Sequence, residues 1–122
     1  KTLLDARGEA YVRGGRIYIK YDEPSPDLQG VTTIVKIGSR EISVLRHGNV
    51  RSEQRFHADR SMVGYYEMAQ GSFPLETRTG SMDIRFDGFV GRAAWAYELW
   101  IGGAEAGHFQ VILDVQEMEE AK

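Results

Sequence analysis

Arg46 is the residue whose charge and position most clearly suggest chemistry. It shares one face of an expected strand with Val44, and this face must point inward if the fold has a core. The same alternation places Glu23 on the face of Ile19 and Tyr21. An unpaired guanidinium inside a protein is strongly unfavourable. The sequence therefore predicts an internal ion pair between Glu23 and Arg46, or a bond from Arg46 to a backbone carbonyl.

Further polar side chains fall on the inward faces of other expected strands. With Ser52 as an additional inward group, the candidate ligand-binding residues are Tyr21, Glu23, Thr33, Arg46, Gln54, Tyr66, Thr77 and Tyr97. One interpretation is a polar pocket for an anionic or amphipathic small molecule. The alternative is a satisfied structural network, or an Arg46 that extends to the barrel mouth. Buried polar groups are usually satisfied within the protein, which favours this alternative.

No sequence motif indicates catalysis, a metal site or a cofactor. The histidines, His47, His57 and His108, lie on different expected elements and have no partner at a metal-ligand spacing. The serines fall mainly in turns, and no Gly-x-Ser-x-Gly string is present. The glycines form neither a dinucleotide-binding fingerprint nor a phosphate-binding loop. We therefore predict no catalytic residue, no metal and no cofactor.

Residues 46–60 are locally basic, which would suit a phosphate or a nucleic acid. Arg51, Glu53, Arg55 and His57 alternate outward on one expected strand, however, as a solvated sheet face requires. The whole chain has a formal net charge of −3. Nucleic-acid and anionic-membrane surfaces need a clear basic excess, so we expect neither partner.

A chain of short antiparallel hairpins is what positions these side chains. Gly14-Gly15 supplies the two positive-φ positions of a two-residue turn. Counting from this turn aligns Val12 with Ile17 on one face and Glu9 with Lys20 on the other. A slip of one residue would destroy both sets of pairs. Later turns near residues 38–41, 48–50 and 57–61 give three more alignments, which are Ile37 with Ile42, Ile42 with Phe56, and Phe56 with Met62.

Gly80-Ser81 is the clearest predicted turn in the second half of the chain. It would join one strand over residues 73–79 to another over residues 82–87. Two opposite-charge pairs support this register, and they are Arg78 with Asp83 and Glu76 with Arg85. Such exposed pairs contribute only about 0.2–1 kcal/mol each, so they indicate register and not stability. The meander would place residues 82–87 between 73–79 and 92–101.

Three more turns are predicted from glycine positions. Their alignments are Met68 with Leu75 around Gly71-Ser72, Met82 with Tyr97 around Gly88–Gly91, and Ile101 with Phe109 around a loop from Gly102 to His108. The register at Gly71-Ser72 also places Glu67 opposite Glu76, a like-charge pair that weakens this alignment.

The chain of 122 residues is expected to form one domain, because a single alternating pattern runs through it without a linker. The segment 24–30 contains two prolines and predicts a surface loop. The acidic tail from about 117 to 122 is expected to fray. No cysteine and no apolar membrane-spanning run are present, so a cytoplasmic location is the default expectation. The chain lacks an initiator methionine, so whether an upstream segment or export signal was removed stays open.

Several strings of residues resemble a known family in their order and spacing. They are Tyr21-Asp22-Glu23, Thr33-Ile34-Val35-Lys36-Ile37, Val44-Leu45-Arg46-His47-Gly48, Gln54-Arg55-Phe56 and Tyr66-Glu67-Met68-Ala69-Gln70-Gly71. Together with the final hairpin, they resemble the YwiB-like family of uncharacterised bacterial proteins. The resemblance implies an antiparallel up-and-down β-barrel of the calycin, or lipocalin-like, type, and it transfers no catalytic residue. It also implies a strand before Leu3 that is missing from this sequence.

Trp100 lies on the outward face of its expected strand, and the predicted register places it near Ile112. An exposed tryptophan beside an isoleucine suggests a contact patch, and an uncovered first strand would offer a sheet edge. Both features predict a homodimer. Three functions therefore stay open: a barrel that binds a small molecule, an assembly module acting through the edge or the Trp100 patch, and, more remotely, a calycin-type enzyme.

Overall fold

The computed structural model describes residues 5–118, and these residues form an all-β fold. Nine strands build one sheet in which each strand is hydrogen-bonded to its neighbours in the sequence. The strands are β1 (Gly8–Arg13), β2 (Arg16–Asp22), β3 (Val31–Ile37), β4 (Glu41–Gly48), β5 (Arg51–His57), β6 (Met62–Met68), β7 (Gly71–Asp87), β8 (Val90–Ile101) and β9 (Ala104–Val115). A short 3₁₀ helix, η1 (Pro26–Leu28), lies in the proline-containing loop. The predicted antiparallel meander of sequence neighbours is confirmed. The predicted position of residues 82–87 between 73–79 and 92–101 is wrong, because 73–79 and 82–87 belong to the single strand β7, and both parts pair with β8.

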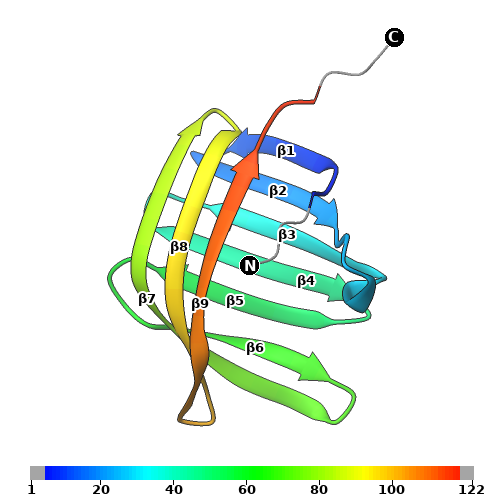
Figure 1. Cartoon of the computed structure of the whole chain (residues 1–122), viewed down its shortest axis with the longest axis vertical. Coiled ribbons are helices and arrows are strands. Elements are labelled where there is room, and N and C mark those ends of the chain that lie inside the picture. Colours follow the sequence, from blue (N-terminus) through cyan, green and yellow to red (C-terminus); the bar gives the residue numbers. More distant parts are fainter. Residues whose placement is uncertain (1–4, 119–122) are drawn as a thin grey trace.

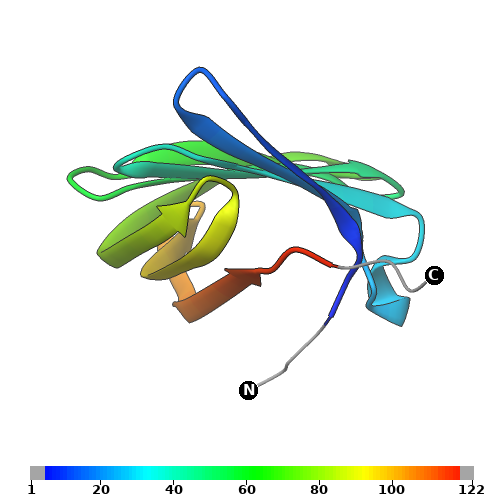
Figure 2. The same cartoon turned by 90° about the horizontal axis from the view of Figure 1, so that it is seen from above.

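The sheet curls into a half-barrel. Strands β1–β6 form one curved layer, and β7–β9 fold back across it (Figures 1 and 2). Within residues 5–118, β1 pairs only with β2 and β9 pairs only with β8, so the two edges of the sheet are not joined there. Residues 1–4 and most of the predicted acidic tail, residues 119–122, lie outside the described residues.

An apolar core fills the space between the two layers. Ile37, Ile42 and Phe56 are each at most 1% exposed, and they come from three successive strands. Trp95 of β8 packs on Phe56 from the other layer, with ring centroids 5.6 Å apart. Full burial of one such side chain contributes about 1.5–3 kcal/mol, so this cluster holds the layers together.

The hairpins of the first half form in the predicted register. Gly14 and Gly15 have φ values of 60° and 77°, and Val12 lies opposite Ile17. Ile37 pairs with Ile42, which in turn pairs with Phe56. Alternation and turn chemistry agree throughout these strands, so only one register buries the apolar face.

The predicted turn at Gly80-Ser81 is wrong, because this dipeptide lies inside the long strand β7. The register of β7 against β8 shifts between Thr79 and Ser81, which marks a β-bulge. A bulge adds one residue and therefore changes which residues face inward, from the odd positions before it to the even positions after it. A two-residue turn produces the same change. The expected cross-strand ion pairs are replaced by pairs within β7, Arg78 with Glu76 and Arg85 with Asp83.

The other late turns are also tighter than predicted. Met68 pairs with Gly71 instead of Leu75, Met82 with Trp95 instead of Tyr97, and Tyr97 with Phe109 instead of Leu113. Each shift is an even number of residues, so the same side chains still face inward. The observed β6–β7 register places Glu67 opposite Ser72, and it thereby removes the unfavourable pair of glutamates.

Candidate functional site

A row of polar residues crosses the inner face of the sheet from β2 to β6. Tyr21 lies opposite Thr33, Thr33 opposite Arg46, Arg46 opposite Ser52, and Ser52 opposite Tyr66. Directly opposed residues share a face of the sheet and lie within contact distance. Five strands thus bring together polar residues that lie far apart in the sequence.

The predicted ion pair between Glu23 and Arg46 is confirmed. Oε2 of Glu23 lies 3.5 Å from Nε of Arg46, and the Glu23 and Arg46 side chains are 7% and 29% exposed, respectively. The hydroxyl of Thr33 donates a hydrogen bond to the same carboxylate. Nε of Arg46 is buried and has no hydrogen-bond partner in the described part of the chain, so its contact with Glu23 is electrostatic only. Glu23 is therefore held behind Arg46, which is the more accessible of the two.

Two tyrosines beside this pair keep their protons at neutral pH. Burial raises the pKa of the Tyr21 hydroxyl above its ordinary value, and the Glu23 carboxylate raises it further, while Arg46 partly opposes both effects. Burial also raises the pKa of Tyr97, against smaller opposing effects of Gln54 and Arg46. Both hydroxyls are thus neutral groups that can donate a hydrogen bond.

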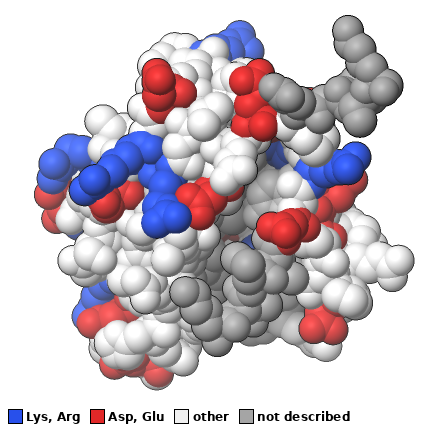
Figure 3. Space-filling view, turned by 45° about the horizontal axis from the view of Figure 1, so that its top comes forward, with Lys and Arg blue, Asp and Glu red and all other residues white. Residues whose placement is uncertain are grey.

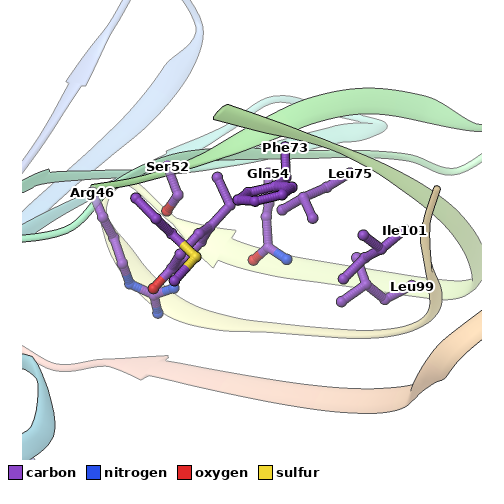
Figure 4. A pocket seen from close by; sticks show the side chains of 9 residues that line it. Arg46, Ser52, Gln54, Phe73, Leu75, Leu99 and Ile101 are labelled. Atoms are coloured by element: carbon purple, nitrogen blue, oxygen red, sulfur yellow. The ribbon is translucent and has the colours of Figure 1, made fainter. Parts of the chain in front are cut away.

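A cavity of about 480 Å³ lies next to the polar row. Small-molecule pockets typically measure about 300–1,000 Å³, so the size suits a small ligand. Five strands, β4 to β8, supply its lining, which consists of Arg46, Ser52, Gln54, Tyr66, Met68, Phe73, Leu75, Leu99 and Ile101. Arg46 and Ser52 lie toward one end, and Leu99 and Ile101 lie toward the other (Figure 4). The cavity is therefore amphipathic along its length.

β5 and β6 diverge beside this cavity. Their pairing covers only Arg51–Glu53 and Tyr65–Glu67, so the predicted pair of Phe56 with Met62 is not formed, although the register is the predicted one. A Cβ atom on Gly64 would lie 1.9 Å from the carbonyl oxygen of Glu53, which shows why glycine is needed at this close approach. Further along, the Thr77 hydroxyl of β7 donates to the carbonyl of Arg55.

The predicted ligand-binding residues separate into two groups. Arg46, Gln54 and Tyr66 line the cavity. The other five do not line it. Glu23 forms the ion pair with Arg46, and Tyr21 and Thr33 lie beside this pair. Thr77 donates to the backbone of β5, and Tyr97 packs on Phe56 and Phe109. Thr77 and Tyr97 therefore have structural contacts that account for their positions.

The apolar walls of the cavity carry no pattern in the sequence that marks them as part of a site. These walls are formed by Met68, Phe73, Leu75, Leu99 and Ile101. Alternation does indicate that Leu75 and Leu99 face inward, but it assigns them to the core. Three of the wall residues remain substantially exposed, with values of 47% for Met68, 41% for Phe73 and 39% for Ile101. Incomplete burial is a property of the assembled sheet, so no sequence signal could separate them from core residues.

The predicted neighbourhood of Trp100 and Ile112 is wrong. The tighter last hairpin places Trp100 opposite Glu105, whereas Ile112 lies opposite Ala94 at the other half of β8. The guanidinium of Arg78 stacks 4.1 Å from the ring centre of Trp100, and the indole Nε1 donates to Glu98 at 3.0 Å. Trp100 is consequently half-buried by neighbouring side chains, and Ile112 is exposed on its own.

The outer surface carries mixed charge. Basic and acidic side chains lie next to one another on the face shown in Figure 3. In the predicted basic segment, Arg55 pairs with Glu53 at 3.5 Å and with Glu41 at 3.9 Å. These contacts support the interpretation of this segment as a solvated sheet face. Between residues 5 and 118, the histidines and carboxylates form no cluster of three that could hold a metal ion. Over the same residues, no helix has the length and apolar character to cross a bilayer.

A family model, a relative and a solved structure each match most of the chain. Residues 1–113 match the family model described as "Domain of unknown function (DUF1934)". A relative from Bacillus subtilis (strain 168), the "Uncharacterized beta-barrel protein YwiB", is 37% identical over 95 residues, which make up 78% of this chain and 66% of that protein. The crystal structure of the ywiB protein from Bacillus subtilis matches with a TM-score of 0.66 and 30% identity over 86% of this chain and 70% of that chain. The predicted resemblance to a YwiB-like family is confirmed.

Proposed function

This chain belongs to the DUF1934 family, and we propose that it binds a small amphipathic or anionic molecule in the cavity of its half-barrel, without catalysis. The names of the family and of the relative describe no activity, so the proposal rests on the cavity. As part of the same proposal, the protein works in the bacterial cytoplasm, because a chain without cysteine needs no oxidising compartment.

The observation that carries the proposal is the combination of a cationic end and apolar walls in one cavity. Arg46 provides the positive charge, and the exposed apolar side chains of Met68, Phe73 and Ile101 surround the space. Exposed apolar surface of this kind on a small domain commonly marks a binding site. A purely structural network around Arg46 explains the ion pair, but it does not explain why three large apolar side chains stay in contact with solvent.

Filling the cavity tests this proposal. Leu99→Trp should occupy the apolar end and weaken binding of an anionic naphthalene sulfonate probe by at least about tenfold, which is the loss of roughly 1.4 kcal/mol. Ile112→Trp is the matched control, because Ile112 is 47% exposed and lies outside the cavity. Near-ultraviolet circular dichroism checks that both variants keep their tertiary packing, since loosely packed states also bind such probes.

Equal binding by folded Leu99→Trp and Ile112→Trp would contradict a role for the cavity. Native mass spectrometry of protein purified from its own host gives an independent measurement, because it reports bound small molecules and subunit number together. We expect a retained adduct in the unmodified chain and its loss in Leu99→Trp.

A second candidate function is assembly through the sheet edges. In the described part of the chain, β1 and β9 each have one paired and one unpaired side. Unpaired edges present backbone donors and acceptors that a second strand can use. This candidate relies on the edges and not on a Trp100–Ile112 patch. Sedimentation velocity at about tens of micromolar should show a dimer, and a monomer at that concentration would contradict it.

A further inference from the structure

We propose that the cavity selects monocarboxylates with a single unbranched tail. The carboxylate lies against Arg46, and the tail extends toward Leu99 and Ile101. This inference rests on the function proposed above, because it names the class of ligand for the same cavity. Its basis is the charge balance at one end of the cavity and the composition of the walls at the other.

Arg46 is the charged group that an entering molecule meets first. Its side chain keeps 29% exposure and lines the cavity, whereas Glu23 keeps only 7% and is not part of the lining. The two groups approach through Nε of Arg46, which is buried and donates no hydrogen bond within residues 5–118. A guanidinium carries five donors in a planar fork that fits a carboxylate with two parallel bonds. Arg46 therefore has donor capacity that its contact with Glu23 does not use.

Glu23 limits the negative charge that this end of the cavity accepts. Its carboxylate lies 3.5 Å from Arg46 and so already balances much of the guanidinium charge. A phosphate ester would add close to two negative charges beside this carboxylate, in surroundings where water screens repulsion only in part. A carboxylate adds one charge. Ser52, which lies opposite Arg46 and lines the same end, offers an uncharged hydroxyl donor beside it.

The walls away from Arg46 suit an alkyl tail. Leu75, Leu99 and Ile101 form the aliphatic side. Phe73 of β7 lies opposite Tyr66, the last residue of the polar row, and Met68 follows Tyr66 two residues further along β6. Each methylene removed from water contributes about 0.8 kcal/mol, which corresponds to a roughly fourfold gain in affinity. Affinity should therefore increase about fourfold for each added methylene until the tail fills the cavity, and it should level off beyond that length.

Three dodecyl compounds test the head group directly. Dodecanoate, dodecyl phosphate and 1-dodecanol share one tail, so differences in their affinity report the head group alone. Displacement of the naphthalene sulfonate probe, with every compound below its micelle concentration, measures the three affinities. We expect dodecanoate to bind about tenfold to a hundredfold more tightly than 1-dodecanol, as expected for a charged hydrogen bond, and more tightly than dodecyl phosphate.

The double variant Glu23→Gln with Arg46→Met removes both charges, so that neither is left alone inside the protein. Its preference for dodecanoate over 1-dodecanol should disappear, while binding of 1-dodecanol persists. Arg55→Met is the matched control, because Arg55 is an outward arginine with two acidic partners and does not line the cavity. It should keep the full preference for dodecanoate.

The outcomes separate this inference from the proposed function. Equal binding of dodecanoate and 1-dodecanol, or a preference that survives in the double variant, would overturn the head-group assignment and leave ligand binding intact. Tightest binding of dodecyl phosphate would overturn the limit to one charge. Failure of every compound and of the probe to bind the folded protein would overturn the proposed function itself.

Discussion

The two ends of the half-barrel are built from the same alternating strands, yet they pack very differently. Around Phe56, Ile37 and Ile42, inward side chains from both layers meet and are almost fully buried. Around Arg46, the inward side chains line a cavity, and large apolar residues such as Phe73 stay exposed. Dense packing contributes stability, and a solvent-accessible apolar space contributes the capacity to bind. One half of the fold is thus structural, and the other half is the candidate functional half.

Strand β7 runs through both halves, and its bulge lies at the boundary between them. Before the bulge, Leu75 and Thr77 face inward beside the cavity and β5. After it, Met82, Ile84 and Phe86 pack on the core. Because the bulge changes the inward set from odd to even positions, one strand can serve two surfaces whose sequence patterns are out of phase.

Deletion of Gly80 should have the largest effect, because it removes the extra residue of the bulge. Either the side chains before position 80 or those after it would then turn to solvent, and we expect loss of cooperative folding. Heat denaturation followed by near-ultraviolet circular dichroism measures this. Gly80→Ala is the control, since the nearest atom to a Cβ there is 4.0 Å away. A deletion variant that unfolds like the unmodified protein would refute the role of the bulge.

Truncation of one aromatic ring in each half should sharpen the contrast. Phe56→Ala removes a side chain that is 1% exposed, so we expect a loss of about 3–5 kcal/mol in the free energy of unfolding. Phe73→Ala removes a side chain that is 41% exposed, and the loss should stay below about 1 kcal/mol. Urea denaturation of the two variants measures both values. Similar losses would mean that the cavity half is packed like the core.

Removal of one partner of the central ion pair should have an intermediate effect. Arg46→Met leaves the Glu23 carboxylate buried without its counterion, and a loss of about 1–3 kcal/mol is expected because Arg46 is partly exposed. Adding Glu23→Gln should recover part of this loss. The coupling energy comes from urea denaturation of the two single variants and the double variant. Strict additivity of the two changes would show that the ion pair does not contribute to stability.

The smallest expected effect concerns alkaline pH. Burial raises the pKa of the Tyr21 hydroxyl in the folded state. The protonated hydroxyl therefore contributes its full stabilisation below pH 10, which is the ordinary pKa of tyrosine in an unfolded chain. This contribution is lost as the pH rises through the folded pKa, since the unfolded chain releases the proton first. Tyr21→Phe should therefore reduce the decline of the free energy of unfolding above pH 10. An unchanged slope would place the alkaline sensitivity elsewhere, for example at Tyr97, whose pKa is also raised.

Much of the fold follows from local rules that are visible in the sequence. The first hairpin was predictable because Gly14-Gly15 defines its turn and both faces agree on one register. The later registers were not, because the change of inward residues from odd to even positions around Gly80-Ser81 fits a turn and a bulge equally well. Since the incorrect shifts in the other late turns were even, the prediction of inward and outward residues remained right where the pairing was wrong.

The candidate site was predictable only in its polar part. Alternation alone placed Arg46 and Glu23 on inward faces, and the physical requirement for a counterion predicted their contact. Alternation could not show that Tyr97 and Thr77 serve the core and the backbone instead of the cavity, because contacts between β5, β7 and β8 depend on how the layers cross.

By itself, the sequence determined the all-β meander, the inward face of each strand and the presence of a charged pair inside, because side-chain alternation and turn chemistry act over a few residues. Only the tertiary structure decided where the inward residues close-pack and where they leave a cavity. That decision depends on the curl of the sheet, the divergence of β5 from β6 and the bulge in β7, which bring strands together across the whole chain.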